Sequence, residues 1–333
     1  MRIRRVVSWS TAIVATAVAV FFLGPRVDLA RHPRPFSLPN DVEGYLARTE
    51  GQFDDIAPGA EKSIVWAGAK RAKTPFAIVY LHGFSATRQE TFPLCDLVAA
   101  RLGANLHYTR LTGHGRGGRA LGEATVSDWL NDAAEAFAIG ERLGDKVIVI
   151  GTSTGGTLAT WLALQPHPTL HACVLLSPNF APRDPNATVL TWPWARQWVP
   201  VVFDPVRRRT AASPEEQRYW TTEYPTVALL PMMGLVKLVA DAPLEDVRVP
   251  VLAIFSPEDR VVDPAATQRA FARFRSPCKR LVPFADRASA NHHVLAGNLI
   301  APANTAHIAE TILAFLEDTG AAGASTPLTR PTP

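Results

Sequence analysis

Residues 146–156 read KVIVIGTSTGG. The first five favour a buried strand, because β-branched side chains pack well on a pleated surface. The turn that follows is rich in glycine and leads into a run typical of a helix, so the chain reverses direction at Ser153. Two interpretations of this serine are open. Either the turn needs only small residues, or it holds a nucleophilic hydroxyl out of the end of a sheet.

Strand and helix patterns alternate along the chain. Apolar, β-branched runs lie at 76–81, 146–150, 171–176 and 249–255, with weaker runs at 62–66, 105–109 and 279–283. Such near-continuous apolar runs suit a parallel sheet that is covered on both faces. Helical periodicity fills 126–143 after a threonine cap, begins again at Asp263-Pro264, and returns at 305–317. The alternation predicts an α/β fold built on a doubly wound, mostly parallel sheet.

One segment, about 178–246, interrupts the alternation, because it has no convincing strand pattern. Its large aromatic and sulfur-bearing side chains include Trp192, Trp194, Trp198, Trp220, Met232 and Met233. We expect a mainly helical cap, inserted between two core strands and packed over the end of the sheet. The sequence leaves open whether the tryptophans face a pocket or form the small core of the insertion.

The first 25 residues have a different character from the rest. MRIRR carries three arginines, and the 18 residues from Val6 to Leu23 carry no charge. That length is the lower limit for a membrane-spanning helix and exceeds the usual apolar region of a signal peptide. We therefore expect residues 1–25 to be an uncleaved signal anchor, a transmembrane helix with the remainder exported to the periplasmic or another extracytoplasmic side. A cleaved secretory signal is the alternative, since Ala15 and Ala17 resemble a cleavage motif.

The rest of the chain divides into three parts. Residues 26–59 are expected to be a proline-rich linker and lead-in, 60–318 the folded domain, and 319–333 a disordered, low-complexity tail. The net charge of +4 is modest and no basic stripe is interleaved with aromatic residues, which argues against a nucleic-acid partner. The three cysteines have no CxxC spacing, so they predict neither a zinc site nor a disulfide framework.

The nucleophile interpretation of Ser153 is favoured by its context. Residues 151–155 fit G-x-S-x-G, with a strand before and a helix after, as that motif requires. A serine hydroxyl needs a general base at neutral pH. Of the nine histidines, the pair in ANHHVLAG lies in a loop between the last apolar strand and the last helix. His293 is preferred because the apolar residues after it can anchor the loop, while His292 stays open.

A base of this kind needs an acid and the reaction needs an oxyanion site. Asp259 lies in the turn directly after the strand in VLAIFSPEDRVVDP, whereas Asp263 is better explained as a helix cap. Glu258 and Asp286 are weaker alternatives. The two backbone N–H donors are predicted at Thr154, which opens the helix after the serine, and at Phe84, which follows the His-Gly turn in YLHGFSATRQE.

Together these pieces resemble the α/β-hydrolase superfamily over roughly 60–318. The resemblance rests on LHGF, RLTGHGR, GTSTGG, the aspartate of SPEDRVV and the histidine of NHHVLAG, in that order. It is nearest to the carboxylesterase and monoacylglycerol-lipase type, with the cap after the strand at 171–176. The resemblance implies that Ser153, Asp259 and His293 form a triad and that Phe84 and Thr154 form the oxyanion hole.

The activity implied is hydrolysis of carboxylic esters with apolar acyl or alcohol groups through an acyl-serine, without a metal or organic cofactor. The expected partners are a small-molecule ester or lipid-like substrate and, through residues 1–25, a membrane. Peptidase, thioesterase, C–C hydrolase and acyltransferase chemistry on the same triad are alternatives, because the triad serves all acyl transfer. A non-catalytic ligand-binding module and a membrane-tethered interaction domain are the alternatives outside enzymes.

Overall fold

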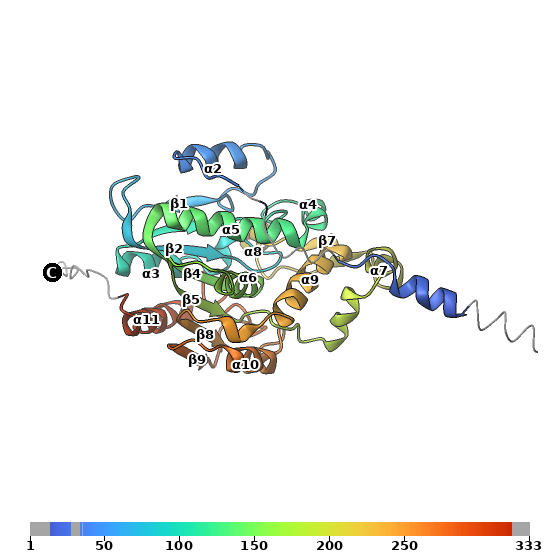
Figure 1. The fold of residues 1–333 in the computed structure, drawn as a ribbon. Coiled ribbons are helices and arrows are strands. Elements are labelled where there is room, and N and C mark those ends of the chain that lie inside the picture. Colours follow the sequence, from blue (N-terminus) through green and yellow to red (C-terminus); the bar gives the residue numbers. More distant parts are fainter. Residues whose placement is uncertain (1–13, 28–33, 35, 322–333) are drawn as a thin grey trace, which may run out of the picture.

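The computed structural model describes residues 14–27, 34 and 36–321. Within them a seven-stranded sheet forms the centre of the molecule, in the order β1-β3-β2-β4-β5-β8-β9 (Figure 1). The strands are β1 (Ser63–Val65), β2 (Thr74–Leu81), β3 (Asn105–Tyr108), β4 (Gly144–Thr152), β5 (Leu170–Leu176), β8 (Val251–Phe255) and β9 (Lys279–Pro283). β1 pairs antiparallel with β3, and all other neighbours are parallel. The predicted α/β fold with a mostly parallel sheet is confirmed.

Helices cover both faces of the sheet (Figure 1). Along β2 and β4, Val79 and Val149 belong to a core shared with α5 (Val126–Leu143) and α6 (Thr154–Ala163). The alternate residues, such as Ile78, belong to a second core with α3 (Leu94–Leu102) and α11 (Pro302–Asp318). Because successive side chains of a strand point to opposite faces, two buried faces explain why the strands read as continuous apolar runs.

Both predicted helix starts are confirmed. Thr125 and Asp128 form a reciprocal capping box at the start of α5. Asp263 caps α10 (Pro264–Arg273) through a bond from the Ala265 N–H, with Pro264 in the first turn. Capping side chains satisfy backbone N–H groups that have no partner inside the helix, which is why these short signals fix helix boundaries well.

Three short helices outside the cap escaped the sequence analysis, and one of them is α3. α2 (Val42–Glu50) lies inside the expected lead-in, and α4 (Gly118–Glu123) follows the glycine-rich loop after β3. The Glu50 carboxylate at the end of α2 accepts bonds of 2.7 and 2.8 Å from the guanidinium of Arg110, and both side chains are buried. This ion pair ties the lead-in to the domain.

The segment between β5 and β8 is mostly helical, as predicted, but it also contains two strands that were not predicted. Its helical elements are η2 (Pro185–Thr191), α7 (Ala195–Val202), α8 (Pro214–Tyr219), η3 (Thr226–Ala228), α9 (Leu229–Ala240) and η4 (Leu244–Asp246). β6 (Val206–Arg208) and β7 (Glu223–Pro225) pair antiparallel as a separate small sheet. Three-residue strands that carry arginines or a proline have no apolar run or alternation to recognise.

The N-terminal helix lies beside the cap. Residues 14–22 are helical and project beyond α7 (Figure 1). The indole N–H of Trp194 donates to the Val20 carbonyl at 3.2 Å, and the Trp194 backbone N–H donates to the Pro25 carbonyl at 2.7 Å. Among the described residues, we find no helix of sufficient length and apolarity to span a bilayer. The other part of the expected anchor, residues 1–13, and residues 322–333 of the expected tail lie outside the described residues.

Candidate active site

Ser153 occupies the turn between β4 and α6 in a conformation that few side chains adopt. Its backbone has φ 52° and ψ −114°, a positive φ at a non-glycine residue. Such conformations are strained and occur preferentially at functional sites. The surrounding bonds hold the turn in place: the Ser153 N–H donates to the Leu176 carbonyl at 2.9 Å, and the Asn179 N–H donates to the Ser153 carbonyl at 3.1 Å.

The glycines of the turn permit a close approach between strand ends and helix. A Cβ atom on Gly155 would lie 1.9 Å from the carbonyl oxygen of Leu81, at the end of β2. A Cβ atom on Gly83 would lie 3.3 Å from the Cβ of Ser153. The spacing of G-x-S-x-G is therefore a packing requirement, and it brings the turn after β2 against the serine.

His293 is hydrogen bonded to Asp259. The His293 Nδ1 to Asp259 Oδ2 distance is 2.7 Å, and both residues are buried. The other carboxylate oxygen accepts the N–H groups of Val261 and Val262 at 2.7 and 2.9 Å. A carboxylate bonded to Nδ1 fixes the imidazole tautomer that carries its proton there and leaves Nε2 as an acceptor.

The alternative residues have other partners. The His292 Nδ1 lies 3.0 Å from the Asp286 carbonyl oxygen, which is a backbone contact. The Asp286 carboxylate accepts bonds from Ser289 and Asn304; burial raises the pKa of this carboxyl, but the hydrogen bonds outweigh it and the net shift is downward. Glu258 is exposed, with its carboxylate 3.7 Å from the His292 ring. Of the acids considered from the sequence, Asp259 is the one that the structure bonds to His293.

Ser153 and Asp259 lie at the same edge of the sheet. Ser153 follows β4 and Asp259 follows β8, with β5 between these two strands. Hydrogen bonds connect the carboxyl ends of these three strands. The Ser153 N–H donates to the Leu176 carbonyl, and the Ser177 N–H donates to the Ile254 carbonyl at 2.8 Å. In open α/β sheets ligands bind at this carboxyl edge.

The two residues predicted to supply oxyanion donors, Thr154 and Phe84, directly follow Ser153 and Gly83 in the sequence. Thr154 is the first residue of α6, where N–H groups lack partners inside the helix and the helix dipole favours negative charge. Phe84 follows Gly83, the residue that approaches Ser153. Its ring packs edge-on against His114, Trp129 and Tyr224, at centroid distances of 5.8, 6.1 and 5.5 Å.

His82 is a structural residue of this region. Its Nε2 accepts the Leu111 N–H at 3.0 Å, so its Nδ1 carries the proton and donates to the Gly83 carbonyl at 2.9 Å. Burial lowers the pKa of His82 to about 4, so the ring is neutral at pH 7. These two hydrogen bonds of His82 therefore stabilise the turn before Phe84.

The sequence analysis missed a buried carboxyl behind this turn. Glu90 is 2% exposed and accepts the Gly83 N–H at 2.6 Å and the Tyr80 hydroxyl at 2.8 Å. Burial raises the pKa of Glu90 from 4.5 to about 8. A possible sequence signal is the position of this acid, close after the LHGF turn, but a charged residue is by default a surface residue.

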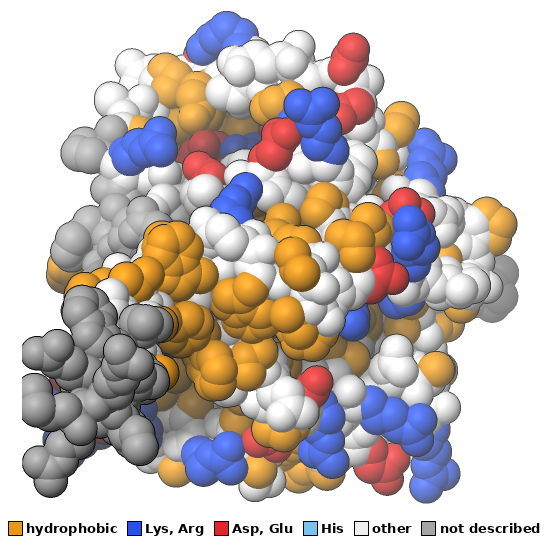
Figure 2. Space-filling view, turned by 90° about the vertical axis from the view of Figure 1, so that its right-hand side faces the viewer, with side chains coloured by type: hydrophobic (Ala, Val, Ile, Leu, Met, Phe, Trp, Pro, Cys, Tyr) orange, Lys and Arg blue, Asp and Glu red, His pale blue; other side chains and the backbone are white. Residues whose placement is uncertain are grey.

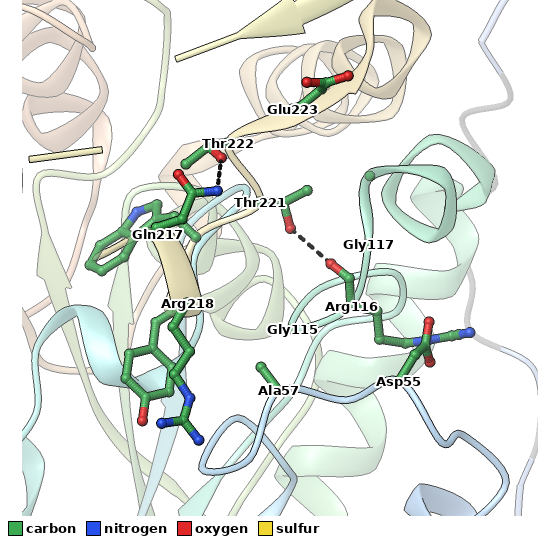
Figure 3. Close-up of a pocket in the computed structure, with 13 residues that line it drawn as sticks. Asp55, Ala57, Gly115, Arg116, Gly117, Gln217, Arg218, Thr221, Thr222 and Glu223 are labelled. Carbon is green, nitrogen blue, oxygen red and sulfur yellow. Dashed lines mark hydrogen bonds and ion pairs between the residues drawn. The ribbon is translucent and has the colours of Figure 1, made fainter. Parts of the chain in front are cut away.

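A polar cavity of about 290 Å³ lies between the glycine-rich loop before α4 and the α8–β7 part of the cap (Figure 3). Arg116 and Gln217 line it from these two sides, and Ser153, Asp259 and His293 are not among the described residues that line it. The Thr221 N–H donates to the Ser85 carbonyl at 2.7 Å, one residue after Phe84. The cavity is therefore close to the Phe84 turn but separate from the candidate triad.

Comparison with known proteins places the chain in a family. The family model described as serine aminopeptidase, S33, matches residues 72–292. A thermostable monoacylglycerol lipase of Bacillus sp. (strain H-257) is 26% identical over 208 residues, which cover 62% of this chain and 80% of the lipase.

Solved structures share the fold. One, from work on the metagenome-derived lipolytic enzymes LipS and LipT, has a TM-score of 0.63 at 22% identity and covers 79% of this chain and 99% of that one. The monoacylglycerol lipase of Paleococcus ferrophilus has a TM-score of 0.55 at 18% identity, and the match covers 78% of this chain and 98% of that one. With the family model matching more than half of its length, the chain belongs to the serine aminopeptidase, S33, family; it has the α/β-hydrolase fold and is similar to lipases.

Proposed function

We propose that this protein hydrolyses carboxylic esters with apolar acyl or alcohol groups through an acyl intermediate on Ser153. The observation that carries the proposal is the buried His293–Asp259 bond of 2.7 Å at the sheet edge where Ser153 is held at a positive φ. A serine in a strained turn and an oriented imidazole are the two parts that nucleophilic acyl transfer needs.

In the proposed mechanism, Ser153 Oγ attacks the ester carbonyl carbon while His293 Nε2 takes the hydroxyl proton. Asp259 stabilises the imidazolium that forms, and the N–H groups of Phe84 and Thr154 donate to the oxyanion. Collapse of the tetrahedral intermediate expels the alcohol, which receives its proton from His293. Water then attacks the acyl-serine with His293 as base, releasing the acid and restoring Ser153.

A lipid-like ester is the preferred substrate class. Support comes from the monoacylglycerol lipase from Bacillus, which is similar over most of its length, and from the apolar surface of the cap. The family description names an aminopeptidase, so a peptide amide is the second candidate substrate. Both substrates use the same acyl-transfer steps, and only the leaving group differs.

We further propose that residues 1–25 hold the enzyme at a membrane, with the hydrolase domain on the exported side. The uncharged run from Val6 to Leu23 with arginines before it supports this. The cap exposes Val201 and Val202 by 83 and 66%, and Figure 2 shows apolar side chains gathered on the side of the molecule where α7 lies. A lipid substrate would be taken up from that side.

Hydrolysis of p-nitrophenyl esters from acetate to palmitate, alongside aminoacyl p-nitroanilides, tests the proposed activity. We expect ester turnover that rises with acyl length beyond acetate and that disappears in Ser153→Ala. Turnover of the anilides in preference to every ester would replace the esterase assignment with a peptidase. Ester turnover that survives in Ser153→Ala would exclude Ser153 as the nucleophile.

A further inference from the structure

A buried chain of hydrogen bonds joins the turn at Gly83 to the turn at Ser153, and the mechanism above does not use it. Its centre is Glu90, in η1 (Arg88–Glu90), whose Oε1 accepts both the Gly83 N–H at 2.6 Å and the Tyr80 hydroxyl at 2.8 Å. Two donors on one carboxyl oxygen hold that oxygen in a fixed position.

The series of hydrogen bonds continues to the residue before the nucleophile. The Tyr80 hydroxyl oxygen lies 2.9 Å from Thr152 Oγ1. A phenol has a single proton, and Tyr80 donates it to Glu90, so the Thr152 hydroxyl must be the donor to Tyr80. Thr152 is the last residue of β4 and directly precedes Ser153. The hydrogen bonds therefore run from Thr152 through Tyr80 to Glu90. The Gly83 N–H donates to the same Glu90 oxygen.

These bonds bear on the direction of the Phe84 N–H. The peptide plane that contains this N–H also contains the Gly83 carbonyl, and the plane is rigid. His82 Nδ1 and the Ala86 N–H donate to that carbonyl at 2.9 and 3.3 Å. Glu90 holds the N–H of the preceding plane. Two successive peptide planes are thus fixed, one by His82 and one by Glu90.

We propose that Glu90 is a positioning residue that aims the Phe84 N–H at the oxyanion and, through Tyr80 and Thr152, fixes this donor relative to Ser153. The inference rests on the proposed hydrolase function. The close packing supports it, because a Cβ atom on Gly83 would lie 3.0 Å from Glu90 Oε2 and 3.3 Å from the Ser153 Cβ. A displacement of the Glu90 carboxyl would therefore be transmitted to the donor turn.

The protonation of Glu90 agrees with this role. Burial raises the pKa of its carboxyl to about 8, so the group is mostly neutral at pH 7. A neutral carboxyl accepts two hydrogen bonds without placing a full negative charge behind the oxyanion site. The titratable side chains that interact with Glu90 are Tyr80 on β2 and Cys95 on α3, and burial raises the pKa of both above the neutral range.

Two substitutions of similar size distinguish a positioning role of Glu90 from a role in packing alone. Glu90→Gln keeps a neutral acceptor oxygen, whereas Glu90→Met fills similar space without one. At pH 7 we expect Glu90→Gln to keep kcat within about threefold of the wild type, and Glu90→Met to lose about tenfold or more in kcat with little change in KM, because only transition-state stabilisation is lost.

Tyr80→Phe provides a second test with a matched control. Tyr80 and Tyr108 are both buried and lie on neighbouring strands with ring centroids 5.9 Å apart. Each donates to the carboxyl group of an acidic residue, Glu90 for Tyr80 and Asp96 for Tyr108. We expect both phenylalanine variants to lower the melting temperature and only Tyr80→Phe to lower kcat. This pair keeps the inference testable if Glu90→Met fails to fold.

The outcomes are distinguishable from failure of the proposed function. If the wild type neither turns over esters nor reacts with a phosphonate at Ser153, the proposed function and the inference are both wrong. If the wild type is active and kcat is equal in Glu90→Gln and Glu90→Met, or falls equally in Tyr80→Phe and Tyr108→Phe, the positioning role alone is wrong. Loss of kcat in Glu90→Met and Tyr80→Phe, with Glu90→Gln and Tyr108→Phe active, supports it.

Discussion

At the residue scale, the hydrogen bond to Asp259 distinguishes His293 from its neighbour His292 as the candidate general base. We expect His293→Asn to lower kcat by a factor of about 10³ or more, because the general base is lost. His292→Asn should retain kcat within about fivefold, since its ring contacts the Asp286 backbone rather than Asp259. Ester hydrolysis at pH 8 measures both variants. A greater loss in His292→Asn would assign the base to the neighbouring residue.

The titration of Glu90 predicts a pH-dependent stability. In the unfolded chain this carboxyl loses its proton near 4.5, and in the folded protein near 8. Between these values the folded state binds more protons, so this group makes the free energy of unfolding fall as pH rises through that window. Glutamine does not titrate. We therefore expect the melting temperature of Glu90→Gln, relative to the wild type, to rise from pH 5 to pH 9; a constant difference would contradict a buried, titrating Glu90.

At this scale the sequence identified the functional residue types well, but it identified their hydrogen-bond partners less well. The G-x-S-x-G context singled out Ser153 because strand, turn and helix are local features. The choice between His292 and His293 depended on how a loop folds back over another strand, which periodicity does not describe. Glu90 was missed for a related reason, because its burial depends on packing between η1 and β2 rather than on neighbouring residues.

At the element scale, the approach of α6 to β2 predicts the effect of one glycine. A methyl group on Gly155 would lie 1.9 Å from the Leu81 carbonyl oxygen, so helix and strand must separate in Gly155→Ala. We expect a loss of about 3 kcal/mol or more in the free energy of unfolding. Gly68→Ala is the control, because no atom lies within 4 Å of its added Cβ. Urea unfolding measures both; equal stabilities would show that the close approach is not required.

The elements that the sequence revealed are those whose signals are local and strong. All seven strands of the main sheet coincide with apolar runs, and α5 begins after its predicted cap. α2 and α4 are too short for helical periodicity to emerge, and β6 and β7 are held by pairing with each other rather than by an apolar pattern. Short elements on the rim of a fold are therefore the part that sequence patterns describe least.

At the scale of the whole molecule, one face carries a group of exposed apolar side chains. Figure 2 shows a group of apolar side chains on the side where α7 lies. The exposed large apolar side chains of the cap are Trp192, Val201, Val202 and Phe203, and those of the N-terminal segment are Val14, Val18, Val20, Phe22 and Leu23. Exposed apolar surface of this kind usually marks a contact with a partner or a membrane.

We expect this face to bind anionic lipid vesicles. The double substitution Val201→Ser and Val202→Ser should weaken co-sedimentation of the full chain with phosphatidylglycerol vesicles, because two exposed apolar side chains no longer enter the lipid. Leu97→Ser, on α3 at the opposite side of the molecule, is the control, because Leu97 is also an exposed apolar residue, at 42%. Equal binding by all three proteins would exclude the cap face from the contact.

The central claim is that Ser153 is an activated nucleophile, and an active-site-directed fluorophosphonate tests it most directly. Mass spectrometry after peptide cleavage should find one adduct per chain, on the peptide that contains Ser153, absent in Ser153→Ala and much slower to form in His293→Asn. A folded wild-type protein that forms no adduct at Ser153, or an adduct that persists in Ser153→Ala, would contradict the account.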